Sequence, residues 1–157
     1  MRPPAQLARA IYGNVLATSL VVAFSEDNDY STTEIAVSVL VTGLVFWIAH
    51  VYASLIAGCY TAGRRLTRAE VGAEFYGEWP VVQALFPPVV VLLLGTIGLL
   101  SHDTAVNLAI AVGVASLVLW SLAIGRQERM SPLALAVMTL LNALFGVAVV
   151  LLKVIVH

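Results

Sequence analysis

Three glutamates spaced four residues apart are the side chains of this 157-residue chain best suited to hold a metal ion. Glu70, Glu74 and Glu78 lie in segment 63–79, and this spacing places successive carboxylates on one helix face, one turn apart. Carboxylate oxygens suit hard divalent cations such as Mg²⁺, Mn²⁺ and Fe²⁺. The same pattern is also typical of a solvated acidic face, partly neutralised by neighbouring arginines. The spacing of the glutamates is therefore compatible with two interpretations, a metal site and a solvated acidic face.

A second group consists of polar side chains inside long apolar stretches. Strongly polar groups at membrane depth are costly, which makes them candidates for function. A histidine can bind a metal, carry a proton or form a structural hydrogen bond, and buried asparagines often join helices. We predict a polar translocation seam from these residues, with simple helix packing as the alternative. The seam comprises Asn14, His50, Ser54, Gln83 and Asn142.

No sequence motif of an enzyme is present. The chain lacks Gly-x-Ser-x-Gly, His-Glu-x-x-His, a phosphate-binding loop and Cys-x-x-Cys. We therefore predict no enzymatic activity, no catalytic residues and no certain cofactor, with a divalent metal ion only as a substrate. A net charge of −1 and a pI near 6.3 leave no basic surface for nucleic acid.

The composition describes the elements that must position these residues. Hydrophobic residues make up 61% of the chain, charged residues 11%, and the mean hydropathy is +0.97. Soluble domains carry about 25% charged residues, so the lipid bilayer is the expected surrounding. We predict a multi-pass protein of a cell membrane, with a bacterial inner or plasma membrane as the expected location.

Five apolar stretches approach the ~20 residues that cross a bilayer as a helix. Because lipid offers no partners to backbone groups, all five are predicted to be helices. The fold class is an all-α membrane bundle in one domain, and segment 63–79 forms a cytoplasmic amphipathic helix that begins at Arg68 after the capping-box residue Thr67. The predicted spans are residues 7–24, 34–61, 80–100, 104–124 and 132–156.

The charges predict the orientation of this bundle. Seven of the eight basic residues fall on one side of a five-span arrangement, and only Lys153 lies on the other. The loop that follows the first span carries three acids and no base. The positive-inside rule then places the N-terminus in the cytoplasm and the C-terminus outside. The seven are Arg2, Arg9, Arg64, Arg65, Arg68, Arg126 and Arg129, and the acids are Glu26, Asp27 and Asp29.

Two adjacent prolines predict a break in the third span. Pro87 and Pro88 remove two backbone donors and leave carbonyl groups near Gln83 without their helical partners. Transporters use broken helices to bind substrates inside the membrane. The alternative is a simple kink in the helix, with no substrate passing through it.

The layout resembles the vacuolar iron transporter family. The matching features are Ile11-Tyr12-Gly13-Asn14 in the first span, the small-residue run ending at Tyr52 before Arg64-Arg65, and the three glutamates. The resemblance implies five spans, a homodimer, and export of Fe(II) or Mn(II) from the cytosol against protons. The family's metal-binding Asp and Met have no counterpart at residues 14–15 and 47–50.

These features predict a small integral membrane transporter or channel for a cation. The family resemblance implies that the cation is a divalent metal ion and that its transport is coupled to protons. Five helices leave little room for an enclosed pathway, so we expect a homodimer with the pathway between its subunits. The alternative is a membrane scaffold or accessory subunit that transports nothing and packs against a partner protein.

Overall fold

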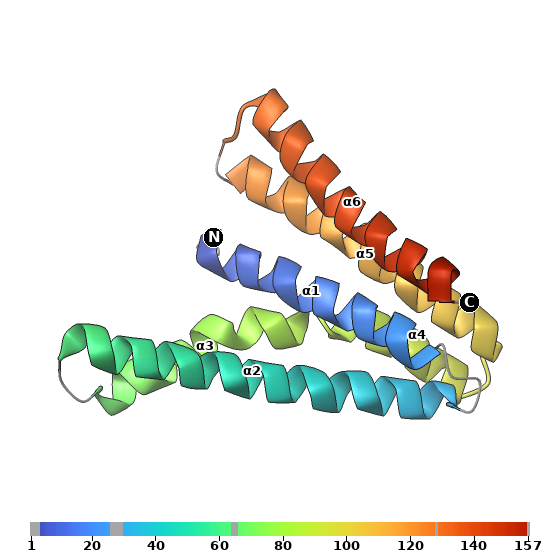
Figure 1. Cartoon of the computed structure of the whole chain (residues 1–157), viewed down its shortest axis with the longest axis horizontal. Coiled ribbons are helices and arrows are strands. Elements are labelled where there is room, and N and C mark those ends of the chain that lie inside the picture. Colours follow the sequence, from blue (N-terminus) through green and yellow to red (C-terminus); the bar gives the residue numbers. More distant parts are fainter. Residues whose placement is uncertain (1–3, 26–29, 64–65, 128, 157) are drawn as a thin grey trace.

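The computed structural model describes residues 4–25, 30–63, 66–127 and 129–156 as helices joined by short connections (Figure 1). The all-α prediction is confirmed for this part of the chain. The charged residues Arg2, Glu26, Asp27, Asp29, Arg64 and Arg65, used above for orientation, lie outside the described residues, as does the side chain of Lys153. The six helices are α1 (Pro4–Ser25), α2 (Thr32–Ala62), α3 (Arg68–Gln83), α4 (Phe86–Thr96), α5 (His102–Gln127) and α6 (Pro132–Val156).

Three of these helices are long and apolar enough to cross a membrane. The qualifying stretches are Ala8–Ser25 in α1, Thr32–Thr61 in α2 and His102–Ala123 in α5. The pair α3 and α4 qualifies as a fourth candidate when it is taken as one bent span. The apolar stretch Pro132–Ala148 of α6 is shorter. The structure is thus a helical membrane bundle with three or four candidate spans.

Local sequence signals set the helix ends. Ser31 before α2 and Thr67 before α3 each form a full capping box with a glutamate three residues later. The helix start predicted at Arg68 is therefore confirmed. α2 ends at Gly63, whose φ of 61° is the left-handed conformation that glycine adopts without strain.

The boundary predicted at residue 79, between the cytoplasmic helix and the third span, is not a helix end in the structure. Instead, α3 continues through Pro80 to Gln83, and α4 begins at Phe86 with an angle of 49° between the two helices. Pro87 and Pro88 lie in the first turn of α4, where the missing backbone donors would have no helical acceptor. The break that the prolines predict is present. α3 itself packs against α1 and α2 and so belongs to the bundle.

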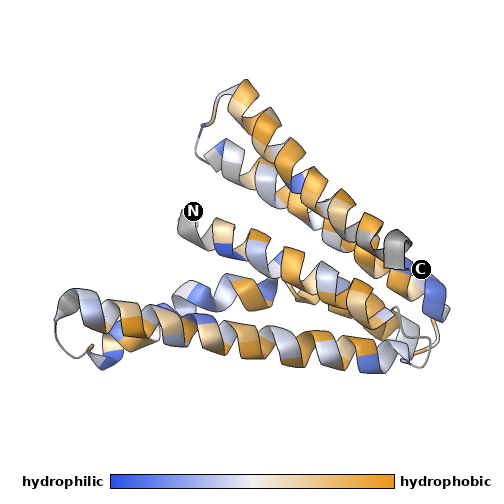
Figure 2. Ribbon diagram, in the orientation of Figure 1, coloured by the Kyte–Doolittle hydropathy of each residue, from blue (hydrophilic) through white to orange (hydrophobic). Residues whose placement is uncertain are grey.

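Helix α1 lies at the centre of the bundle. It contacts α2, α3, α5 and α6, and Figure 1 shows it between the layer formed by α2, α3 and α4 and the hairpin formed by α5 and α6. Figure 2 shows that apolar residues also cover outward faces of α2 and α6, as lipid contact requires. The buried core includes Ala17, Val21, Ile35, Val39, Leu85, Leu92, Ala109 and Leu117.

Candidate functional site

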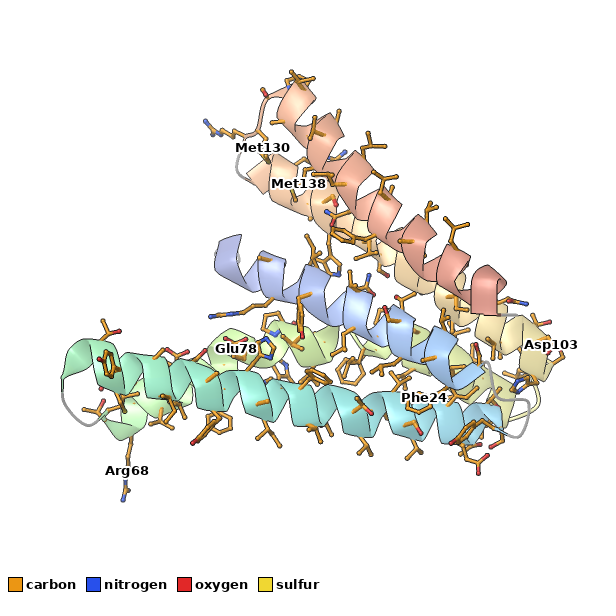
Figure 3. All side chains as sticks on the ribbon, in the orientation of Figure 1. Phe24, Arg68, Glu78, Asp103, Met130 and Met138 are labelled. Atoms are coloured by element: carbon orange, nitrogen blue, oxygen red, sulfur yellow. The ribbon has the colours of Figure 1, made fainter. Side chains whose placement is uncertain are left out.

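A buried ion pair joins α1 to α3. Glu78 is 3% exposed, and its Oε1 lies 3.0 Å from Arg9 Nε in an ion pair. The Ser54 hydroxyl of α2 donates to the same oxygen at 3.3 Å. We name Arg9, Ser54 and Glu78 the Glu78 cluster; in Figure 3 the labelled Glu78 lies among α1, α2 and α3.

Arg9 is held in place by a second bond. Its Nη1 donates to the backbone oxygen of Gly77 at 2.9 Å, and a Cβ atom on Gly77 would lie 3.0 Å from that nitrogen. Glycine at this position therefore lets the guanidinium approach the α3 backbone. The Arg9 side chain remains 32% exposed, so the pair is accessible from one side.

The second carboxylate oxygen of Glu78 is unpaired within the part of the chain that the structure describes. Glu78 Oε2 is buried and accepts no hydrogen bond among the described residues. Buried polar groups in folded proteins almost always have partners, and an exception calls for a specific explanation. A carboxylate with one paired and one unpaired oxygen can accept a proton at the unpaired oxygen.

An aromatic pair joins α1 to α2, about one helical turn from Arg9 and from Ser54. The rings of Tyr12 and His50 have centroids 5.0 Å apart, and His50 Nδ1–H donates to the Phe46 carbonyl oxygen at 3.0 Å. This tautomer leaves the lone pair on Nε2. Because Tyr12 follows Arg9 by three residues and His50 precedes Ser54 by four, the pair and the Glu78 cluster share one face of each helix.

The two predicted asparagines join helices instead of lying in the Glu78 cluster. Asn14 is fully buried, and its Nδ2 donates to the Gly113 carbonyl oxygen of α5 at 2.7 Å. Asn142 is 7% exposed, and its Nδ2 donates to the Ser121 hydroxyl of α5 at 2.6 Å. Gln83, the fifth member of the predicted seam, is half-buried at the end of α3.

The three glutamates of the predicted metal site have separate environments. Glu70 Oε2 accepts hydrogen bonds from the backbone and hydroxyl groups of Thr67 at 2.7 and 2.9 Å, and Glu78 is paired with Arg9. Glu74 is half-buried. Among the described residues, no three His, Cys, Asp or Glu side chains form a group that could hold a metal ion. A shared helix face therefore does not gather these carboxylates around one ion within a single chain.

Sequence reasoning missed the role of Arg9, which it used only for orientation. The available signal was an arginine inside an otherwise apolar stretch, because such a residue needs a buried partner or a route to water. Its partner Glu78 could be recognised in the sequence only as one of the three glutamates spaced four residues apart.

Replacing Asn142 with leucine tests the packing role of the second asparagine. We expect a loss of about 0.6 kcal/mol in the free energy of unfolding, typical of hydrogen bonds between membrane helices. The loss stays small because the Ser121 hydroxyl keeps its bond to the Leu117 carbonyl oxygen at 2.8 Å. Unfolding by denaturant in detergent measures it, and a loss above about 2 kcal/mol would contradict a role limited to this contact.

No protein-family model, curated protein or solved structure matches the chain.

Proposed function

We propose that the chain is a small membrane transporter for a cation and that it exchanges the cation against protons at Glu78. One observation carries the proposal: Glu78 is buried among three helices, with one carboxylate oxygen paired and the other buried without a hydrogen-bond partner among the described residues. Ionisable groups inside membrane proteins usually mark ion and proton pathways. A proton or cation arriving at the unpaired oxygen competes with the half-exposed Arg9 for the same carboxylate.

In the proposed topology, the bent pair α3–α4 is the third crossing and α6 is the fifth. The N-terminus faces the cytoplasm and the C-terminus lies outside, in a bacterial inner or plasma membrane. Arg9 near the start of α1 and Glu78 in α3 then lie in the cytoplasmic half of the bilayer. The bend at Ala84 and Leu85 supplies a hinge between this half and α4.

We also propose that the transporter is a homodimer. The described clefts of the single chain are lined mainly by apolar side chains, such as Ile11, Val137 and Phe145 between α1 and α6. A hydrated route for a cation therefore needs walls that a second copy supplies. The resemblance to vacuolar iron transporters makes Fe²⁺ and Mn²⁺ the first metals to test.

Cation flux into liposomes that hold the purified protein tests the proposal. We expect Glu78→Gln to abolish proton-coupled flux, because the amide can neither exchange a proton nor neutralise a cation. Glu34→Gln is the matched control, since Glu34 caps α2 through Ser31 and glutamine also completes a capping box. Flux of Glu78→Gln at the wild-type rate would contradict the proposal, and wild-type flux of His50→Ala or Glu74→Ala would remove that residue from the route.

A specific observation also favours the second candidate, an accessory subunit that transports nothing. Asn14 and Asn142 each donate a hydrogen bond to α5, and polar side chains commonly join membrane helices in this way. In this case the purified wild-type chain carries no cation in liposomes, while Glu78→Gln still changes its stability. Flux by the wild-type chain alone excludes this candidate.

A further inference from the structure

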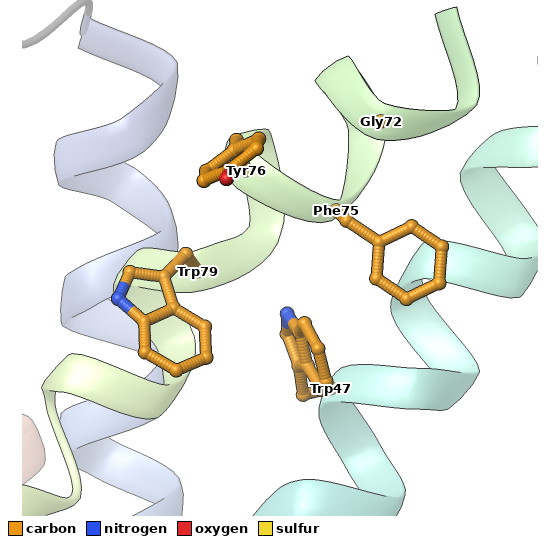
Figure 4. Close-up of a pocket in the computed structure, with 5 residues that line it drawn as sticks. All are labelled: Trp47, Gly72, Phe75, Tyr76 and Trp79. Atoms are coloured by element: carbon orange, nitrogen blue, oxygen red, sulfur yellow. The ribbon is translucent and has the colours of Figure 1, made fainter. Parts of the chain in front are cut away.

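An aromatic cleft lies between α2 and α3. It has a volume of about 350 Å³ and is lined by Trp47, Gly72, Phe75, Tyr76 and Trp79, as Figure 4 shows. The Trp47 ring lies 5.6 Å from the Phe75 ring and 5.7 Å from the Trp79 ring, at interplanar angles of 76° and 78°. Edge-to-face rings at these distances are in direct contact, so Trp47 packs against both other rings and the cleft is the space that this cluster borders. This volume is within the range of small-molecule sites, about 300 to 1,000 Å³.

The sequence of α3 keeps this space open. Phe75 and Trp79 are four residues apart and Gly72 precedes Phe75 by three, so all three lie along one helix face. A Cβ atom on Gly72 would meet nothing within 4 Å, and the Tyr76 side chain is 81% exposed. Aromatic rings that served only as core would be covered by neighbouring side chains. These rings remain accessible from outside the chain.

The chemistry of the walls selects the ligand class. Aromatic faces attract cations within about 6 Å of the ring centre, and rings arranged as a cage bind methylated ammonium groups. Hard metal ions need oxygen ligands, which the rings of Trp47, Phe75 and Trp79 do not supply. The carboxylate of Glu74 on the same helix adds a negative charge, whereas that of Glu78 is compensated by Arg9.

We propose that the aromatic cleft binds the methylated ammonium group of an organic cation. This inference goes beyond the proposed function, because it adds a separate site for an organic cation beside the Glu78 cluster. The two sites are linked through α2, where Trp47, His50 and Ser54 recur at spacings of three and four on one helix face. In addition, the buried indole N–H of Trp47 has no acceptor among the described residues, and the hydroxyl oxygen of a choline-like ligand supplies one.

Isothermal titration of the purified full chain, in a detergent without choline groups, tests the site. We expect saturable binding of choline and tetramethylammonium, and no binding of 3,3-dimethylbutan-1-ol, the uncharged carbon analogue of choline. Trp79→Leu is expected to weaken choline binding about tenfold or more, because a cation–π contact is lost. Trp120→Phe is the matched control, since Trp120 lies in α5 outside the cleft, and it is expected to bind as the wild type does.

Phe75→Leu removes a second wall and keeps the test valid if Trp79→Leu fails to fold; we expect it too to weaken choline binding. Equal binding of choline and its uncharged analogue would overturn the site. Wild-type choline binding by either folded variant would also overturn it.

The source of the ammonium group is tested separately in nanodiscs. If phosphatidylcholine weakens choline binding relative to phosphatidylglycerol, the natural occupant is a lipid headgroup, and if it does not, the occupant is a free solute. Both results keep the site. Loss of choline binding in a chain that still transports metal ions overturns the site alone. Choline binding without flux of any cation overturns the transport function alone.

Discussion

Replacing Arg9 with methionine is expected to lower the free energy of unfolding by about 3 kcal/mol. Methionine keeps an apolar stem of similar length but removes the guanidinium, so Glu78, 3% exposed, is left buried without its counter-charge. Removing one partner of a buried ion pair typically costs about 3 to 5 kcal/mol. The lower end applies because the Arg9 side chain is 32% exposed and water partly screens the pair.

Unfolding by denaturant or heat in detergent measures this loss. Glu78→Gln is expected to lose only about 1 kcal/mol, because the remaining charge on Arg9 can reach water. The double variant Arg9→Met/Glu78→Gln is therefore expected to be more stable than Arg9→Met alone. Arg68→Met is the control: Arg68 points away from the bundle in Figure 3, and its loss should stay within about 0.5 kcal/mol. Wild-type stability of Arg9→Met would show that the pair contributes nothing.

Helix identity and many helix ends could be predicted because their signals are local. Thr67 and Glu70 lie within one turn, so their capping box was readable from spacing alone, as was the effect of Pro87 and Pro88 on the third span. The apolar composition likewise required helices, since each backbone group must be satisfied within its own segment. These inferences needed no knowledge of which helix packs against which.

The Glu78 cluster could not be predicted because it depends on tertiary contacts. Spacing placed Glu78 on a face with Glu70 and Glu74, yet its partners Arg9 and Ser54 come from two other helices. The buried residues of α3 are Glu78, Pro80, Val81 and Val82, so the C-terminal part of α3 packs against α1 and α2. A polar segment is excluded from a bundle only if its charges lack partners there.

The sequence Tyr12-Gly13 in the middle of α1 acquires a physical role from the structure. Asn14 bonds α1 to α5, while Gly13 brings α1 against α3 at backbone distance. A Cβ atom on Gly13 would lie 2.5 Å from the Val81 carbonyl oxygen and 2.8 Å from the Val81 Cα. Small residues at such contacts are what allow membrane helices to approach closely.

Gly13→Ala is accordingly expected to lower the free energy of unfolding by about 2 to 3 kcal/mol, and Gly13→Val by more. Backbone atoms of α3 cannot rotate away as a side chain can, so the two helices must separate. Gly72→Ala in α3 is the matched control, because its Cβ atom would meet nothing within 4 Å. The control is expected to be neutral or more stable by about 0.5 to 1 kcal/mol, the usual gain of alanine over glycine in a helix. Equal stability of the two variants would contradict the close contact.

The same separation must also weaken the ion pair, because Arg9 lies one turn before Gly13 on α1 and Glu78 lies close to Val81 on α3. We therefore expect the losses from Gly13→Ala and Arg9→Met to be non-additive, with the double variant losing less than the sum of the two single losses. Contacts that share a backbone shift typically show coupling of about 0.5 to 3 kcal/mol. Strict additivity would mean that the Gly13 contact and the ion pair form independently. Coupling would mean that a glycine without chemical groups of its own sets the distance at which Arg9 meets Glu78.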